Sequence, residues 1–157
     1  MTLDVEGLYR SHGHMVLRRA RTLLGDEHEA QEALQEVFAS LLRSPEALRN
    51  ASSVVAWMYR ATTHWCLNQL RNRRTGARLL ELRAPQPQQG ASRSEALAEV
   101  RNILARLPPE VAAAAVYHHV DGMTHTEVAE LLGCSRRQVG YLLERARKSL
   151  ERVEQSA

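Results

Sequence analysis

Several residue types that restrict function are scarce in this 157-residue sequence: aromatic residues make up 4%, and there are two cysteines and one lysine. Strand-favouring residues are outnumbered by Ala, Leu, Glu and Arg, a bias that predicts an all-α fold. Cys66 and Cys134 lie far apart without a partner motif. A disulfide framework is therefore not expected, and the composition favours a reduced, cytoplasmic protein.

Membrane, metal and catalytic signals are also missing. No apolar run approaches the length of a membrane span, and the N-terminus lacks a signal peptide's apolar core, so we expect no membrane insertion. The seven histidines lack helical i, i+4 ligand spacing, and there is no CxxC. We predict no metal and no cofactor, with a zinc site built from distant residues as a minor alternative. Without a phosphate-binding glycine loop, G-x-S-x-G or paired apolar carboxylates, we expect no enzyme.

A polar segment divides the chain. Residues 84–94, APQPQQGASRS, contain two prolines and three glutamines, a composition that predicts a flexible linker between residues 1–83 and 95–157. The net charge is +3, mostly from arginine, which suits contacts to phosphates and bases but also follows from a GC-rich genome. The first part has 12 arginines against 9 acidic residues, and the second has 8 basic against 9 acidic residues. A net charge of −1 is unusual for a DNA-binding domain.

The apolar pattern of residues 1–83 predicts a three-helix bundle. One helix is expected from about residue 3 to 24, ended by Gly25. Asp26 and Glu29 form a capping box for a second helix, which Ser44-Pro45 stops. After a polar loop around Asn50, Ser52 or Ser53 caps a third helix that ends in the basic cluster 71–74. The apolar face of the second helix is Ala30, Ala33, Leu34, Val37, Phe38, Leu41 and Leu42. The apolar face of the third helix is Val54, Trp57, Met58, Ala61, Trp65 and Leu70.

The second part predicts four helices. Ser92 and Glu95 form a capping box for a helix that carries Leu97, Val100, Ile103, Leu104 and Leu107, and another helix runs from 109 to 119. Thr124 and Glu127 cap a short helix, 127–132, and Gly133-Cys134 is a turn. Ser135 and Gln138 cap a helix to about 153. Its core face is Val139, Leu142, Leu143, Ala146, Leu150 and Val153. A short helix, a turn with glycine and a longer helix indicate a helix-turn-helix.

Three surfaces could bind a partner. Arg136, Arg137 and Gln138 could face base edges, with Arg145, Arg147 and Lys148 near phosphates; alternatively, this is a helical pair with solvated arginines. Aromatic residues beside arginines in the third helix suit single-stranded nucleic acid. Trp57 and Trp65 fall on its apolar face; Trp57 is expected in the core, and Trp65 is left open between core packing and stacking. Better ligand candidates are Tyr59, Arg60, Thr63, His64 and Asn68. Glu29, Glu32, Gln35 and Glu36 form an acidic stripe that could dock a basic partner but, from pattern alone, indicates a solvated face.

Four segments in this order resemble a bacterial extracytoplasmic-function (ECF) sigma factor of the sigma-70 family, built from regions 2 and 4 alone. They are LYRSHGHMVLRRARTLLGDEHEAQEALQEVFASLL (8–42), AWMYRATTHWCLNQLRNRR (56–74), LARLPPEV (104–111) and DGMTHTEVAELLGCSRRQVGYLLERARKSL (121–150). The resemblance implies a region 2 bundle at 1–83, a linker at 84–94 and a region 4 with the helix-turn-helix at 95–157.

The resemblance also implies a function. Such a protein binds the clamp and flap of core RNA polymerase and directs promoter-specific initiation, with binding energy, not ATP, opening the DNA; an anti-sigma factor is a further partner that it allows. It assigns clamp binding to Glu32, Gln35, Glu36 and Phe38. It assigns the minus-ten strand, with a flipped base, to Asn50, Ser52, Tyr59, Arg60, Thr63, His64, Asn68, Arg71, Arg73 and Arg74. It assigns the minus-thirty-five duplex to Thr124, Arg136, Arg137, Gln138, Gly140, Tyr141, Arg145 and Lys148.

Departures from the family pattern leave an alternative open. At the clamp position where this chain has Glu32, the family usually has aspartate. It commonly has Arg-Asn in place of Thr63-His64 and aspartate in place of Asn68, and these differences suggest an altered minus-ten preference. It typically has an arginine near position 112, and cations within the stretch that here reads Gln138-Val139-Gly140-Tyr141-Leu142-Leu143. The alternative is therefore a sigma-like adaptor whose second domain contacts protein more than DNA, with Tyr141 and Leu142 in an apolar surface.

Overall fold

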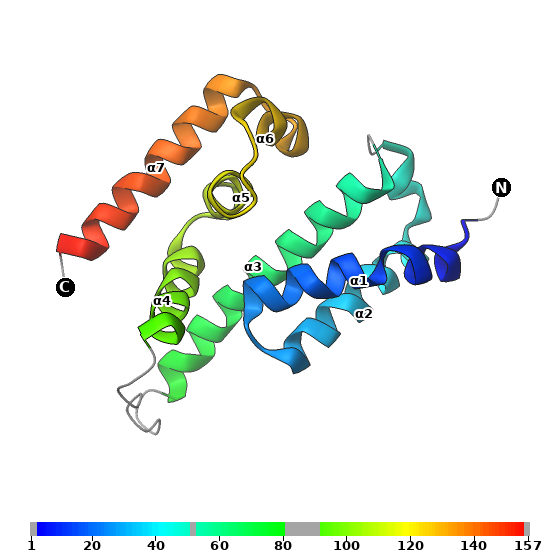
Figure 1. Cartoon of the computed structure of the whole chain (residues 1–157), viewed down its shortest axis with the longest axis horizontal. Helices are drawn as coiled ribbons and strands as arrows, with labels where there is room; N and C mark the ends of the chain where they lie inside the picture. The colour runs from blue at the N-terminus through cyan, green and yellow to red at the C-terminus, as the bar shows by residue number, and fades with distance from the viewer. Residues whose placement is uncertain (1–2, 51–52, 81–91, 156–157) are drawn as a thin grey trace. The chain divides into compact units, whose positions relative to one another are not determined.

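The computed structural model describes residues 3–50, 53–80 and 92–155, and excludes the side chains of 50, 74–80, 92–94 and 153–155. These ranges contain helices and no strand, which confirms the all-α prediction. The elements are α1 (Val5–Leu24), α2 (Glu27–Arg43), the 3₁₀ helix η1 (Pro45–Asn50), α3 (Val54–Leu80), α4 (Ser92–Arg106), α5 (Pro109–Ala115), the π-helical turn η2 (Val116–Val120), α6 (His125–Leu132) and α7 (Arg136–Gln155) (Figure 1).

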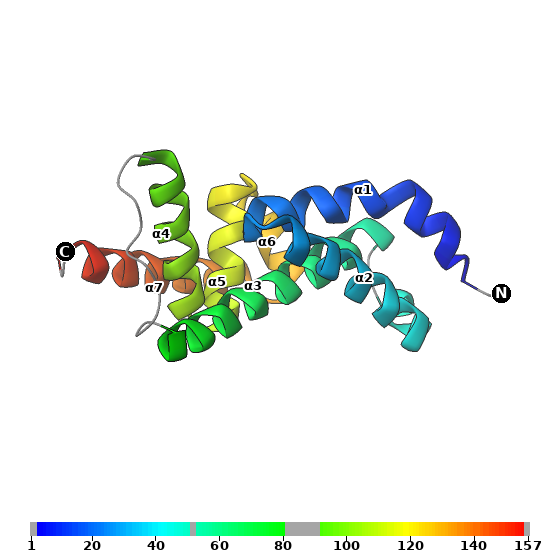
Figure 2. The same ribbon diagram turned by 90° about the horizontal axis from the view of Figure 1, so that it is seen from below.

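The turn between α1 and α2 is closed by the predicted capping residues. Gly25 adopts a left-handed conformation with φ of 67°, and its N–H donates to the carbonyl of Arg21. The Asp26 carboxylate accepts a 2.8 Å hydrogen bond from the Glu29 N–H. Arg21 also forms an ion pair with Glu27 at 2.6 Å, and this bond is the main reason that the pKa of Glu27 is lowered to about 2. The turn therefore brings α1 and α2 side by side, as Figures 1 and 2 both show.

One apolar core holds the first three helices together. It forms because the three-four spacing of α2 faces α1 and the start of α3. Leu42 is an exception to the predicted face, since it is 68% exposed: it follows Leu41 by one residue and points away from the stripe. Trp57 is partly buried against this core, which supports a packing role. The buried residues of this core are Val16, Leu34, Val37, Phe38, Leu41 and Met58.

The chain between α2 and α3 is more ordered than the predicted polar loop, because Pro45–Asn50 forms a 3₁₀ helix. Ser53 caps α3: its Oγ accepts a 3.0 Å hydrogen bond from the Ala56 N–H. The prediction that α3 ends at the basic cluster 71–74 is wrong, since the helix continues to Leu80. One glycine, Gly76, costs only about 1 kcal/mol, and the good helix formers around it carry the helix through.

The helices α4 and α5 depart from the sequence pattern in two ways. Ser92 is the first residue of α4 instead of its cap, and Leu97 and Val100 are each 46% exposed, so they are not core residues. The helix that begins at Pro109 changes to π-helical pairing at Val116, and the N–H of Asp121 donates to the Val116 carbonyl at 3.1 Å. The four alanines before this turn are buried, which allows α5 to pack closely.

The predicted helix-turn-helix is formed by α6 and α7. Both hydrogen bonds of the Thr124–Glu127 capping box are present, and α6 begins at His125, two residues earlier than expected. Gly133 makes the turn with φ of 71°. The Ser135 Oγ accepts a 3.0 Å hydrogen bond from the Gln138 N–H at the start of α7. The buried face of α7 is Val139, Leu142, Leu143 and Ala146, whereas Leu150, predicted in the core, is 42% exposed.

Two compact units make up the fold, Met1–Cys66 and Leu67–Ala157, and the division falls within α3. The predicted linker, 84–94, lies mostly outside the described residues, so the boundaries 1–83, 84–94 and 95–157 stay a prediction. In the described ranges, none of the helices combines the length and the apolar character that crossing a membrane requires.

Candidate nucleic-acid interface

The start of α7 presents polar side chains to solvent. Arg136, Arg137 and Gln138 are exposed, whereas Val139 directly after them is buried. Within the described part of the chain, neither arginine has an ion-pair partner. The N-terminal turn of a helix-turn-helix reader is the part that contacts base edges. Two guanidinium groups and an amide at this turn match that chemistry, because arginine pairs with guanine and glutamine with adenine.

Further along α7, the candidate phosphate contacts separate into two kinds. Arg145 and Lys148 are exposed and three residues apart, on one side of the helix. Arg147 is different, because it forms ion pairs with both Glu144 and Glu151. Its charge is therefore compensated within the helix, and Arg145 and Lys148 are the better phosphate candidates.

The uncharged middle of α7 has two explanations. Val139, Leu142 and Leu143 are buried, so packing accounts for them, and Leu142 is not part of an apolar surface as the adaptor hypothesis required. Gly140 is not explained by packing, since a Cβ atom placed there would meet no atom within 4 Å. Tyr141 is 60% exposed. Gly140 therefore leaves a bare stretch of backbone, accessible to a partner, next to an exposed aromatic ring.

The first turns of α3 contain a buried polar cluster that sequence reasoning missed. Arg19 of α1 is only 8% exposed, and its Nε donates a 2.8 Å hydrogen bond to the Thr63 Oγ1. Its guanidinium carbon lies 3.7 Å from the centroid of the Tyr59 ring. The signal was present, because Arg19 stands on the apolar face of α1, three residues after Val16.

Burial corrects one predicted minus-ten residue in this cluster. Thr63 is fully buried, so it does not contact DNA directly; its hydroxyl is occupied by Arg19 and by the Tyr59 carbonyl. Tyr59 is partly buried, and Arg60 and His64 are exposed. Desolvation of the ring, and then the charge of Arg60, lower the pKa of His64.

The remaining minus-ten candidates lie further along the chain. Asn68 is exposed, and its Oδ1 accepts a 3.1 Å hydrogen bond from Arg71. Arg73 is partly exposed. Ser52 lies outside the described residues, as do the side chains of Asn50 and Arg74.

The acidic stripe of α2 is partly exposed and makes local pairs. Glu32 contacts the His28 imidazole at 2.8 Å, and Glu36 forms an ion pair with Arg43. Gln35 is exposed between them. Phe38, which was assigned to the same contact surface, is 5% exposed and belongs to the core instead, with its ring edge-on to Tyr9 at 5.1 Å. A partner could reach the polar residues of the stripe but not Phe38.

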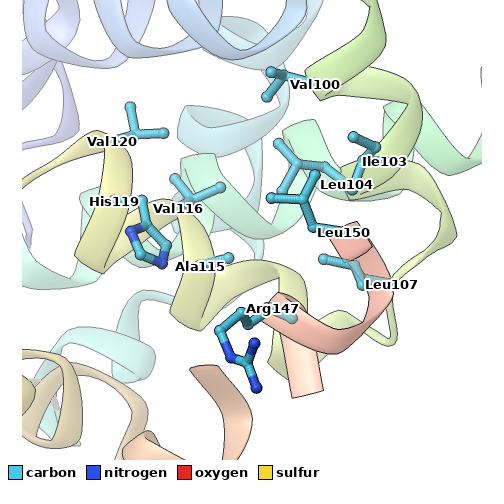
Figure 3. Close-up of a pocket in the computed structure, with 11 residues that line it drawn as sticks. Val100, Ile103, Leu104, Leu107, Ala115, Val116, His119, Val120, Arg147 and Leu150 are labelled. Atoms are coloured by element: carbon cyan, nitrogen blue, oxygen red, sulfur yellow. The ribbon is translucent and has the colours of Figure 1, made fainter. Parts of the chain in front are cut away.

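The second unit also has an apolar pocket of about 290 Å³, shown in Figure 3. Residues of α4, of α5 with η2, and of α7 line it, and among the described residues its charged or ionisable lining groups are Arg147 and His119. Three lining residues, Val100, Val120 and Leu150, are among the exposed large hydrophobic residues of the described chain. Such an open apolar surface is typical of a protein contact.

Comparison with known proteins identifies the family. Residues 8–75 match the family model of sigma-70 region 2, and residues 97–150 match that of sigma-70 region 4. The ECF RNA polymerase sigma factor SigM of Mycobacterium tuberculosis is 31% identical over 147 residues, which cover 93% of this chain and 74% of SigM. The chain belongs to the ECF sigma factors of the sigma-70 family.

Other ECF relatives agree. SigE of Mycolicibacterium smegmatis is 30% identical over 91% of this chain, which spans 58% of SigE. Among solved structures, CnrH in complex with the cytosolic domain of CnrY matches with a TM-score of 0.57 at 22% identity, over 97% of this chain and 88% of that one. The sigma factor RpoE in complex with the anti-sigma factor NepR, from Bartonella quintana, gives 0.55 at 18% identity, over 97% of both chains. These similarities to solved structures show the sigma fold in this ECF chain.

The residue ranges of the two family models assign each of these surfaces to region 2 or region 4. The buried Arg19 cluster and the acidic stripe of α2 fall in region 2, and the helix-turn-helix and the apolar pocket fall in region 4. In the described part of this sigma factor, no group of three or more His, Cys, Asp or Glu side chains could hold a metal ion.

Proposed function

We propose that this chain is an alternative sigma factor that binds core RNA polymerase and directs promoter-specific initiation. The observation that carries the proposal is the start of α7, where Arg136, Arg137 and Gln138 are exposed on a capped helix that follows a formed helix-turn-helix. This helix reads the minus-thirty-five duplex. The exposed residues of α3 hold the separated minus-ten strand, and the polar residues of the α2 stripe contact the polymerase clamp.

The proposed mechanism needs no catalytic residue. Extruding one base from the duplex costs a few kcal/mol, because the base loses its pairing and stacking. Stacking of a base on an aromatic ring returns about 1–3 kcal/mol, and arginines add backbone contacts. These contacts exist only with the open strand, so binding energy favours the melted state. The protein acts in the cytoplasm, where core polymerase and the chromosome are.

The test is transcription with purified components. The chain and core polymerase are incubated with a genomic run-off library, and the start sites are sequenced. We expect a discrete set of promoters that core polymerase alone does not use. A chain that binds core polymerase but selects no promoter would contradict the proposal.

A second candidate function is an adaptor that binds polymerase and uses region 4 for protein contact. The apolar pocket between α4, η2 and α7 favours it, as does the net negative charge of residues 95–157. In the run-off experiment, core binding without promoter selection supports this candidate. Loss of core binding would contradict both.

An anti-sigma factor is a further proposed partner. One solved structure of similar fold is CnrH in complex with the cytosolic domain of CnrY, and another is the sigma factor RpoE in complex with the anti-sigma factor NepR. We infer that an anti-sigma factor binds this chain and holds it inactive. Co-purification of the tagged chain from its own host tests this partner.

A further inference from the structure

The buried guanidinium of Arg19 is the least expected feature of the first unit. A charged side chain in a core is costly unless its environment supplies partners. Arg19 is 8% exposed on the apolar face of α1, and its partners on α3 are the Thr63 hydroxyl and the Tyr59 ring. Both residues lie in the segment proposed to hold the separated strand, so the question is what this arginine does there.

The three residues contact one another around Tyr59. The Arg19 Nε donates to the Thr63 Oγ1 at 2.8 Å, and that hydroxyl donates to the Tyr59 carbonyl at 2.7 Å. The guanidinium lies over the Tyr59 ring, 3.7 Å from its centroid. Tyr59 is therefore held twice, at its backbone through Thr63 and at its ring through Arg19.

The chemistry of arginine fits this arrangement better than that of other residues. Its planar, permanently charged guanidinium can stack on an aromatic face while an N–H at its edge donates a hydrogen bond. Because Arg19 covers one face of the partly exposed ring, a nucleic-acid base that stacks on Tyr59 must do so away from Arg19. An orientation fixed before binding also spares the entropy that a rotating ring would lose.

We propose that Arg19 is a positioning residue of the strand-binding site, which fixes the Tyr59 ring so that one base of the separated strand can stack on it. The proposal rests on the proposed function, in which α3 holds that strand. It adds a residue on a different helix, α1, that touches no DNA and acts through Tyr59.

The fold supplies a matched pair of residues that separates positioning from stability. Thr62 and Thr63 are adjacent, both are fully buried, and each hydroxyl donates to a backbone carbonyl four residues earlier, at 2.6 and 2.7 Å. Of the two, Thr63 receives the Arg19 hydrogen bond. Thr62→Val and Thr63→Val therefore remove equivalent helix contacts, and the second also breaks the link to Arg19.

The experiment uses the chain bound to core polymerase and a fluorescein-labelled, single-stranded 12-mer of the non-template strand from a promoter found in the run-off library. Fluorescence anisotropy gives the affinity, and urea unfolding of the free chain gives the stability of each variant. We expect Thr63→Val to weaken strand binding about 5- to 10-fold, as loss of part of a base–aromatic stack predicts. Thr62→Val should change it less than about twofold at a similar unfolding midpoint.

Two further variants test the route through Tyr59. In a Tyr59→Leu background, Thr63→Val should have no additional effect on strand binding, because its effect passes through the ring. Arg19→Lys should weaken binding less than Arg19→Leu, since lysine keeps the cation over the ring.

The outcomes separate this inference from the proposed function. If the wild-type complex selects no promoter, the proposed function fails and the inference falls with it. If the wild type selects promoters and binds the strand, equal effects of Thr62→Val and Thr63→Val overturn the inference alone. An undiminished effect of Thr63→Val in the Tyr59→Leu background also overturns it.

Discussion

Arg19 and Gly140 stand at positions where helix periodicity favours other residue types. Arg19 takes a core position on α1 and is accommodated by Thr63 and Tyr59. Gly140 takes an interior position on α7 where no neighbouring atom requires a glycine. Packing explains the first residue and not the second. Gly140 therefore remains the stronger indication of close approach by a partner.

Replacing Gly140 by alanine tests this interpretation. Because the added Cβ meets open space, we expect Gly140→Ala to raise the free energy of unfolding by about 1 kcal/mol. The same methyl group should weaken promoter binding if the helix backbone approaches DNA closely. Urea unfolding and promoter binding by the polymerase complex measure the two effects. A more stable variant with unchanged promoter binding would show that Gly140 makes no close contact with DNA.

The two cysteines should differ strongly in reactivity. Burial raises the pKa of the Cys66 thiol from 9.0 to about 12, against a smaller opposing effect of Arg19. The thiolate is the reactive form, so Cys66 should react roughly 1000-fold more slowly than an unperturbed thiol near pH 8. Cys134 is partly exposed. Ellman's reagent should therefore modify one thiol per folded chain quickly and the second only in urea, and Cys134→Ser should remove the fast phase.

The raised pKa of Cys66 also predicts how stability depends on pH. The native thiol holds its proton more tightly than the unfolded one. Its contribution to the free energy of unfolding is therefore fully present below pH 9.0 and is lost as the pH rises toward about 12. Replacing Cys66 by alanine should flatten this part of the stability profile, and an unchanged slope would contradict the assignment.

Helix ends were the most predictable elements. Helix termini were predicted from residue type, and the structure has a terminus at each of four such residues: Gly25, Asp26, Ser53 and Thr124. Local chemistry decides these positions, because a cap satisfies backbone groups within three or four residues. The C-terminal end of α3 was mispredicted, because a basic cluster does not stop a helix as proline does, and the helix continues to Leu80.

The cap of α6 can be tested with a neighbouring threonine as control. Thr124→Ala removes the hydroxyl that accepts from the Glu127 N–H at 3.1 Å and should lower the free energy of unfolding by about 1 kcal/mol. The pKa of Glu127 is lowered mainly by the hydrogen bond from the Thr124 backbone N–H, which alanine keeps, and less by the threonine side chain, so this pKa should rise only in part. Thr126→Ala, at an exposed position inside α6, should have little effect. Equal losses of stability would show that the cap contributes nothing specific.

At the scale of the whole molecule, the charge balance of residues 95–157 limits what α7 can do. Residues 95–157 carry 8 basic and 9 acidic residues, and Arg147 is compensated within its helix. Phosphate attraction is therefore weak for a DNA-binding domain, and we expect a shallow dependence of promoter binding on salt. Binding of core polymerase through region 2 would supply the remaining affinity.

The double variant Arg136→Ala, Arg137→Ala tests the proposal that α7 reads DNA. Both side chains are exposed, so the fold and core binding should be unchanged, while promoter-specific transcription should fall by at least about 10-fold. Arg147→Ala is the control, because it removes an exposed arginine of the same helix that is already paired. Run-off transcription and co-elution with core polymerase measure the two properties. Unchanged promoter use would favour the adaptor function.

The sequence by itself determined the all-α class, the helix-turn-helix and most of the caps, because helix periodicity and capping act over a few residues. It also carried the family resemblance in motifs spread along the whole chain. Only the tertiary structure decided which side chains are accessible. Phe38 and Thr63 proved buried, Leu42 and Leu150 exposed, and Arg19 a core residue bound to α3. These outcomes depend on contacts between helices that lie far apart in the chain. Periodicity places a residue such as Arg19 on an apolar face, but it does not show which residues of another helix it contacts.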